Sequence, residues 1–159
     1  MKPNIGIKDG DRDAVVDILN TLLSDEYLLY TKTRKFHWNI VGPRFNDLHK
    51  FFQALYEQLD EIIDDVAERA RSLGGPAYGT LDEFAKSTRL KETPGKNPNE
   101  DGMLKELLSD HEAIIKALRV DLEDCADKYH DAGTNDFLTG LMEQHEKTAW
   151  MIRSFINEK

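Results

Sequence analysis

Two histidines flank a Gly-Pro break in the most aromatic stretch of the chain. His37 and His49 lie in the segment KFHWNIVGPRFNDLHKFF, residues 35–52. Further along, Asp64 and Glu68 are four residues apart, so a helix would place both carboxylates on one face. Imidazole nitrogen together with carboxylate oxygen is a ligand mixture that suits iron. These four side chains are therefore candidate metal ligands.

One chain cannot bring all four candidates to the same metal ion if His49 and Asp64 lie on one straight helix. Their Cα atoms would then be about 22 Å apart, at about 1.5 Å of rise per residue. Ligand atoms must lie within about 2–2.5 Å of the ion, and no side chain spans that gap. Either the histidines and the carboxylates belong to different sites, or two antiparallel subunits each complete the other's site, as a two-fold interface allows.

A run of acidic residues surrounds the two carboxylates. No lysine or arginine lies between Lys50 and Arg69, and like charges one turn apart on a helix repel. A bound cation would stabilise such a face; the alternative interpretation is a face that is merely solvated. No glutamate is followed by histidine three residues later, so the sequence does not predict a Glu-x-x-His di-iron site inside a bundle. The acidic residues are Glu57, Asp60, Glu61, Asp64, Asp65 and Glu68.

Helical periodicity runs through almost the whole chain and would position these residues. The break at Gly42-Pro43 separates the first two helices, with proline expected in the first turn of the second, and Gly74-Gly75-Pro76 ends that helix. Thr80 and Glu83 form the capping-box pattern of a short helix, and Thr134 is the candidate N-cap of the last helix. The long helices are expected over 13–39, from the break to about 73, over about 100–130, and from Thr134 onward. This order predicts an all-α, ferritin-like four-helix bundle whose long second-to-third connection holds the short helix.

The composition limits the class of protein. The chain has 159 residues, 40% hydrophobic and 32% charged, with a net charge of −9. These values predict one globular domain over residues 1–159, with residues 1–12 as a short N-terminal extension, and they oppose unaided nucleic-acid binding. No apolar run approaches the roughly 18 residues that span a bilayer, and the N-terminus lacks the apolar core of a secretory signal. The single cysteine, Cys125, predicts a small core residue in a protein of the reducing cytoplasm.

The segment KFHWNIVGPRFNDLH, continuing to LYEQLDEIIDDVAERARSLGG, resembles the signature of the Dps mini-ferritins (DNA-binding proteins from starved cells). The resemblance covers nearly the whole chain, including the long connection and the GTNDFLT start of the last helix. It implies a cytoplasmic, sometimes nucleoid-associated, hollow dodecamer that binds Fe(II) between two-fold-related subunits. It further implies a ferroxidase that oxidises this iron, preferentially with hydrogen peroxide, stores the ferric oxide and so limits oxidative damage.

The resemblance also assigns roles to individual residues. By position, His37 and His49 of one subunit would bind iron together with Asp64 and Glu68 of its mate. Where the family commonly has Asp or Glu four residues after the second histidine, this chain has Gln53, a neutral and weaker ligand for a second iron ion.

Trp38 and Asp136 each have two possible interpretations. Trp38 would lie close to the iron and intercept oxidising equivalents, or it is an ordinary packed aromatic. Asp131 and Asp136 would line a three-fold pore for iron entry; for Asp136 the alternative is a first-turn carboxylate favoured by the helix dipole. The remaining histidines have no motif support, and we expect surface or packing roles for His111, His130 and His145.

Two rival functions remain. The first is a cage that coats or compacts DNA with little ferroxidase activity, which in this family often depends on a lysine-rich tail. Here Lys2, Lys8 and Arg12 are cancelled by three aspartates within residues 9–13, and the C-terminal SFINEK is no more basic. The second rival is a helical bundle without any metal role, whose acidic residues serve solubility.

Overall fold

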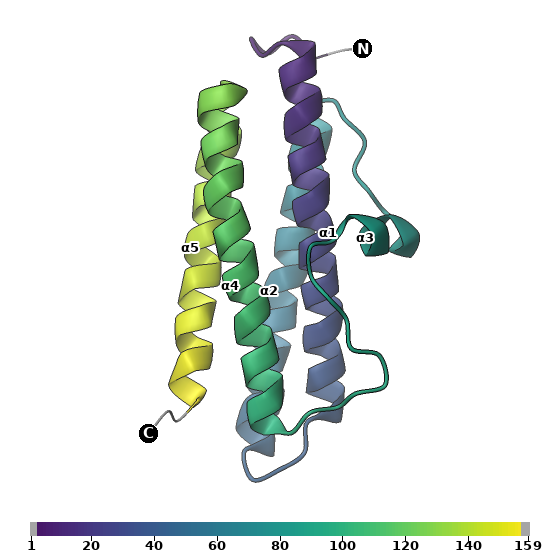
Figure 1. Ribbon diagram of the computed structural model, residues 1–159, viewed down its shortest axis with the longest axis vertical. Helices are drawn as coiled ribbons and strands as arrows, with labels where there is room; N and C mark the ends of the chain where they lie inside the picture. The colour runs from purple at the N-terminus through teal and green to yellow at the C-terminus, as the bar shows by residue number, and fades with distance from the viewer. Residues whose placement is uncertain (1–2, 157–159) are drawn as a thin grey trace.

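Helices make up the computed structural model, which describes residues 3–156 (Figure 1). No strand occurs within that range. The four long helices lie side by side along one axis, and the short helix α3 projects from the side of α1 (Figure 1). The elements are α1 (Asp9–Asn39), α2 (Phe45–Ser72), α3 (Leu81–Ser87), α4 (Glu100–Glu123), the π-helical turn η1 (Asp124–Lys128) and α5 (Ala132–Phe155). The predicted all-α, ferritin-like bundle with a short helix in its long connection is confirmed.

The long helices pack as two hairpins. The backbone of α1 lies closest to that of α2, and α4 lies closest to α5. The connection from α2 to α4 crosses the outside of the bundle and carries α3, which packs on α1 (Figure 1). Apolar side chains at helical spacing fill the space between the hairpins; the largest fully buried ones include Leu19, Leu22, Leu29, Phe36, Phe52, Met103, Leu107 and Ile114.

The capping box of α3 is confirmed. The Glu83 amide donates to Thr80 Oγ1 (3.3 Å), and the Thr80 amide donates to Glu83 Oε2 (2.9 Å). The next residue, Phe84, is buried and stacks on Tyr27 of α1, with ring centroids 4.3 Å apart. A seven-residue helix has little stability of its own. The cap and this stacking contact therefore hold α3 on the bundle.

Two helix boundaries differ from the prediction near the first hairpin. The first helix begins at Asp9, four residues earlier than expected. Arg12 is buried there, and its guanidinium donates to Asp9 and to the Pro3 carbonyl oxygen, so the predicted 1–12 extension is partly helical and packed. The second helix begins at Phe45, and Pro43 precedes it instead of occupying its first turn.

Two further boundaries differ in the second hairpin. The third long helix ends at Glu123 and continues only as η1, because the chain then needs a tight turn in which His130 adopts a positive φ of 56°. Thr134 is not the N-cap of α5. Asp131 is the N-cap, since its carboxylate accepts from the Thr134 amide (2.9 Å) and hydroxyl (2.5 Å).

Cys125 is fully buried, as predicted. None of the helices within residues 3–156 has both the length and the apolar character needed to cross a membrane. Lys2, which belongs to the argument about a basic tail, lies outside the described residues, as do the last three residues of SFINEK.

Candidate metal centre

His37 and His49 face each other across the turn between α1 and α2. His37 is in the last turn of α1, and the two rings stack with centroids 3.8 Å apart and an angle of 21°. Nδ1 of His37 lies 2.8 Å from the carbonyl oxygen of His49, and Nδ1 of His49 lies 3.0 Å from that of His37. A carbonyl oxygen only accepts, so each Nδ1 must carry the hydrogen. Each neutral imidazole is therefore held with a free lone pair on Nε2, the state that binds a metal ion.

The turn that sets this pair is locked to the other hairpin. The Glu100 carboxylate accepts from the Arg44 amide (2.8 Å) and from its guanidinium (3.0 Å). Arg44 also donates to Asp101 (2.5 Å) and to the Phe155 carbonyl oxygen (3.1 Å). Gly42 has a φ of 139°, and a Cβ there would lie 2.5 Å from Glu100 Oε1. The turn thus requires glycine both for its backbone conformation and for the approach of Glu100.

Aromatic rings confine the two imidazoles. Phe45 stacks on His49 with centroids 5.0 Å apart, and Tyr56 meets His37 edge-on at 5.2 Å. His37 is buried, and His49 is partly buried. Since both rings are fixed by main-chain bonds and by packing, the pair is preorganised before any ligand arrives.

Asp64 and Glu68 are not brought to the histidines within one chain. Both are exposed on α2, which runs without interruption from Phe45 to Ser72. The separation of about 22 Å between the Cα atoms of His49 and Asp64 therefore holds. Within residues 3–156, no group of three or more His, Cys, Asp or Glu side chains is arranged to hold a metal ion. The chain presents two histidines at one place and two carboxylates at another.

Comparison with known proteins places the chain in a family. The ferritin-like domain family matches residues 16–159. A low temperature-induced protein of Nostoc sp. (strain PCC 7120) is 48% identical over 153 residues, which cover 96% of this chain and 86% of that protein. The DNA protection during starvation protein 2 of Bacillus anthracis is 33% identical over 91% of this chain and 97% of its own length. The chain belongs to the Dps family of ferritin-like proteins.

The fold agrees with a solved Dps structure. The crystal structure of the Dps protein from Vibrio cholerae O1, described as a member of the ferritin-like diiron-carboxylate proteins, superposes with a TM-score of 0.91. The two sequences are 26% identical, and the match covers 98% of this chain and 97% of that one. Iron storage and DNA protection are thus functions of the family to which this chain belongs.

Gln53, the departure from the Dps pattern, has a partner one turn away. Its Nε2 donates to Glu57 Oε1 over 2.8 Å. A carboxylate only accepts, so the amide of Gln53 must direct its NH₂ group to Glu57 and keep its oxygen free. Both side chains are exposed on α2, beyond the turn that carries His49. The free oxygen is the atom through which Gln53 could bind a cation.

Trp38 is at the surface of the single chain. Its side chain is 66% exposed, so it is not part of the core of the subunit. The guanidinium of Arg34 lies over its ring at 5.1 Å and over the rings of Tyr56 (5.1 Å) and Tyr30 (5.4 Å). Arg34 also donates to the Tyr30 hydroxyl (2.6 Å), which raises the pKa of Arg34. The Trp38 ring therefore shares one cation, Arg34, with Tyr30 and Tyr56.

The carboxylates of the two candidate pore residues differ in their exposure to solvent. The Asp131 side chain is buried, caps α5 and accepts from the guanidinium of Arg69 (3.2 Å). Asp136, in contrast, is exposed on α5. The Asp131 carboxylate is thus already used inside the subunit, and of these two residues only Asp136 has its side chain at the surface.

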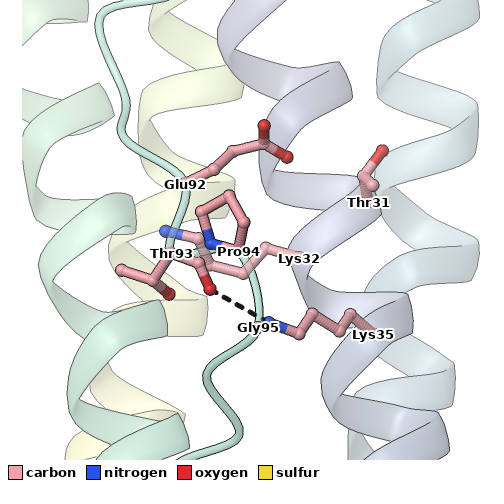
Figure 2. Close-up of a pocket in the computed structure, with 7 residues that line it drawn as sticks. All are labelled: Thr31, Lys32, Lys35, Glu92, Thr93, Pro94 and Gly95. Atoms are coloured by element: carbon pink, nitrogen blue, oxygen red, sulfur yellow. Dashed lines mark hydrogen bonds between the residues drawn. The ribbon is translucent and has the colours of Figure 1, made fainter.

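A hollow of about 380 Å³ between α1 and the crossover connection lies away from the histidines (Figure 2). Figure 2 shows Lys35 reaching across it to the Thr93 carbonyl oxygen (3.3 Å). Lys32, which is nine-tenths buried, donates to the Lys91 carbonyl oxygen (2.8 Å) and to Asp110 (2.5 Å). Both ammonium groups hold the connection on α1. The lysines that line the hollow therefore stabilise the fold.

A polar cluster inside the bundle was not predicted from the sequence. His130 is exposed, as expected of a surface residue, and His111 and His145 are buried, as expected of packing residues. These two, however, contact each other, and His145 contacts the fully buried Glu26. The signal was available: each of the three interrupts the apolar stripe of its own helix, as Glu26 does between Leu22 and Leu29.

Proposed function

We propose that this Dps-family chain assembles into a hollow homo-oligomer, a dodecamer, that oxidises Fe(II) at sites shared between two-fold-related subunits and stores the ferric product. Its main support is the reciprocal bonding of His37 and His49, which leaves two Nε2 lone pairs ready for iron. The remoteness of Asp64 and Glu68 on the same α2 helix supports sharing, because a mate must supply the carboxylates. A cytoplasmic setting is part of the same proposal.

Iron is the substrate in this scheme, and the protein supplies ligands and orientation. His37 and His49 bind Fe(II) through Nε2, while the mate's Asp64 and Glu68 neutralise its charge. Hydrogen peroxide is the oxidant: two Fe(II) ions each give up one electron, the O–O bond breaks, and two protons from solution complete two molecules of water. No hydroxyl radical is released, because both electrons reach the peroxide at one site.

Exposed apolar side chains beside the histidines support a subunit interface there. Trp38, Val41 and Phe45 are 66%, 77% and 46% exposed, although they follow one another closely around the turn. Exposed apolar side chains gathered around one turn commonly mark an interaction site. An interface that covers this turn would also exclude water from the imidazoles, which strengthens their interaction with a cation.

Complementation between two inactive variants tests the sharing directly. His37→Ala and Asp64→Ala should each slow oxidation of Fe(II) by peroxide by about tenfold or more, with the oligomer intact by size-exclusion chromatography. Co-assembled in equal amounts, the variants should regain activity at about a quarter of the sites, because each mixed pair rebuilds one intact site from two chains. Sites formed within one chain would regain nothing, and that result would refute the proposal.

The DNA-coating alternative has less support from the structure. Arg12 is buried and bonded to Asp9 and to the Pro3 carbonyl oxygen, so it is not available to a phosphate. A gel-shift series at rising salt distinguishes the two functions, since binding to DNA phosphates weakens steeply with salt. A further test adds Fe(II) and peroxide and measures the ferric iron that the assembled particle retains. This measurement distinguishes an iron-storage protein from a helical bundle without a metal role.

A further inference from the structure

Three ionisable side chains from three helices form a hydrogen-bonded line through the bundle core. His145 Nε2 on α5 lies 2.8 Å from Glu26 Oε1 on α1. His145 Nδ1 lies 2.9 Å from His111 Nδ1 on α4. All three are essentially buried, with 0% of Glu26, 1% of His145 and 2% of His111 exposed. Because the three groups are buried this deeply, none of them can hydrogen-bond to water while the bundle is closed.

This line, the core triad, joins the two hairpins. Because α1 packs with α2 and α4 with α5, the bond from Glu26 to His145 crosses from one hairpin to the other. The neighbouring acids do not face the triad: Asp25 pairs with Arg89 (2.7 Å), and Asp110 pairs with Lys32 (2.5 Å). On the remaining side, α2 contributes no ionisable group; its lining residues are Leu55, Gln58, Leu59 and Ile62. The triad therefore has to balance its charge by itself.

The hydrogen bonds and the charge balance together indicate how many protons the triad holds. An ionised Glu26 only accepts, so His145 Nε2 carries a hydrogen. Between the two facing Nδ1 atoms there is room for one hydrogen. If it belongs to His145, that ring is an imidazolium paired with the Glu26 carboxylate, and the triad is neutral with His111 uncharged. If it belongs to His111, a buried carboxylate has no counter-charge, which is far more costly.

The geometry excludes a metal ion as the occupant. His145 stands between the other two groups and contacts each through a different ring nitrogen, so the three do not converge on one point. Glu26 Oε2 and His111 Nε2, the outer atoms of the line, have no hydrogen-bond partner within residues 3–156. A proton is the cation that fits this line.

We propose that the core triad is an internal proton site and an acid-sensitive latch: one proton, held on His145, ties the two hairpins together, and a second proton can bind only when they separate. A second proton on His111 would face the N–H of His145 and break their bond. On Glu26 it would remove the counter-charge of the imidazolium. Either way the closed core would contain an unbalanced charge.

Burial, and next the proximity of His145, hold the pKa of His111 well below its ordinary value of 6.5, in agreement with this scheme. Below pH 6.5, where an exposed His111 is protonated, the folded state therefore binds one proton fewer than an opened state. The contribution of His111 to the stability of the closed state is complete above pH 6.5 and is lost as the pH falls below that value. The proton on His145 acts in the opposite direction above pH 6.5, because opening then releases it. Below pH 6.5, one extra proton on opening makes the equilibrium constant for opening rise about tenfold for each unit by which the pH falls.

Hydrogen–deuterium exchange of the assembled protein, corrected for intrinsic rates, tests the latch between pH 6.5 and 5. In the native protein, the protection of α4 and α5 amides should fall about tenfold more steeply per pH unit than in His111→Gln. Glutamine can accept from His145 Nδ1 but cannot take up a proton. The control is His130→Asn, which removes an exposed imidazole at a positive φ that asparagine tolerates. Equal slopes for the native protein and His111→Gln would overturn the proposal.

A second measurement needs no variant. Exchange of the imidazole C2 hydrogens, followed by mass spectrometry, reports the titration of each histidine in the native protein. We expect no midpoint for His111 between pH 5 and 8. A midpoint of about 6.5 for His111 would refute the latch. Saturable binding of Zn²⁺ that alters exchange at His111 and His145 would show a metal site in its place and would refute it equally.

Discussion

His37 and His49 each donate from Nδ1 to the carbonyl oxygen of the other, over 2.8 and 3.0 Å. In many metal sites a side-chain carboxylate fixes the ligand imidazole. Here the main chain of α1 and α2 does so for both rings at once. The availability of the two Nε2 atoms therefore depends on the path of the turn between the helices, and changes to that turn should alter cation binding without touching a ligand.

Gly42→Ala should disturb the histidine pair. Its Cβ would lie 2.5 Å from Glu100 Oε1 at a φ of 139°, so Glu100 must withdraw from Arg44 or the turn must shift. We expect a loss of about 1–3 kcal/mol in the free energy of unfolding and weaker Co²⁺ binding, measured by urea denaturation and titration calorimetry. The control is Gly140→Ala within α5, where the new Cβ meets nothing within 4 Å. That change should leave cation binding unaltered and raise stability by about 0.5–1 kcal/mol.

Gln53→Glu should strengthen binding of a second cation. The new carboxylate would face Glu57 one turn away, so the empty protein should lose a few tenths of a kcal/mol by repulsion. Co²⁺, which neutralises both acids, should raise the Tm more than in the native chain. Exchanging the two residues, in Gln53→Glu/Glu57→Gln, restores the hydrogen bond and should remove the repulsion while keeping the added affinity. An unchanged Co²⁺ stoichiometry in both variants would mean that position 53 does not contribute to the site.

Substitution of Asp131 should lower stability, whereas substitution of Asp136 should affect iron entry. Asp131→Ala removes the N-cap of α5 and leaves Arg69 without its carboxylate, so the free energy of unfolding should fall by about 1–3 kcal/mol. Asp136→Ala should change stability by less than about 0.5 kcal/mol, because the side chain is exposed. If Asp136 lines a pore, that variant should take up Fe(II) more slowly at equal ferroxidase activity per bound ion. Equal uptake would remove it from the pathway.

The thiol of Cys125 should be inert in the folded protein. Burial, assisted by nearby carboxylates such as Asp131, raises its pKa to about 12. The thiol form is therefore favoured by folding, and this contribution is present below pH 9.0, the ordinary value, and is lost as the pH rises toward 12. Alkylation by iodoacetamide at pH 8 should be negligible until urea unfolds the chain. Rapid alkylation under native conditions would contradict the buried position.

Local signals in the chain were enough for much of the fold. Thr80 and Glu83 are three residues apart and satisfy each other's backbone, so the capping box could be predicted without knowing what surrounds it. The N-cap of α5 could not be predicted in this way. Asp131 occupies that position in place of Thr134 with the support of Arg69, which comes from α2. Helix ends depend on such distant partners more than helix interiors do.

The residue types and spacing in the sequence determined the helical bundle, the family signature and the four candidate ligands, because helical periodicity and ligand chemistry are properties of short segments. Only the tertiary structure decided which atoms of those ligands are free. The tautomers of His37 and His49 follow from a turn held by Glu100 and Arg44 across the bundle. Likewise, Glu26, His111 and His145 become one proton-holding unit only when three helices pack, since no spacing along the chain brings them together.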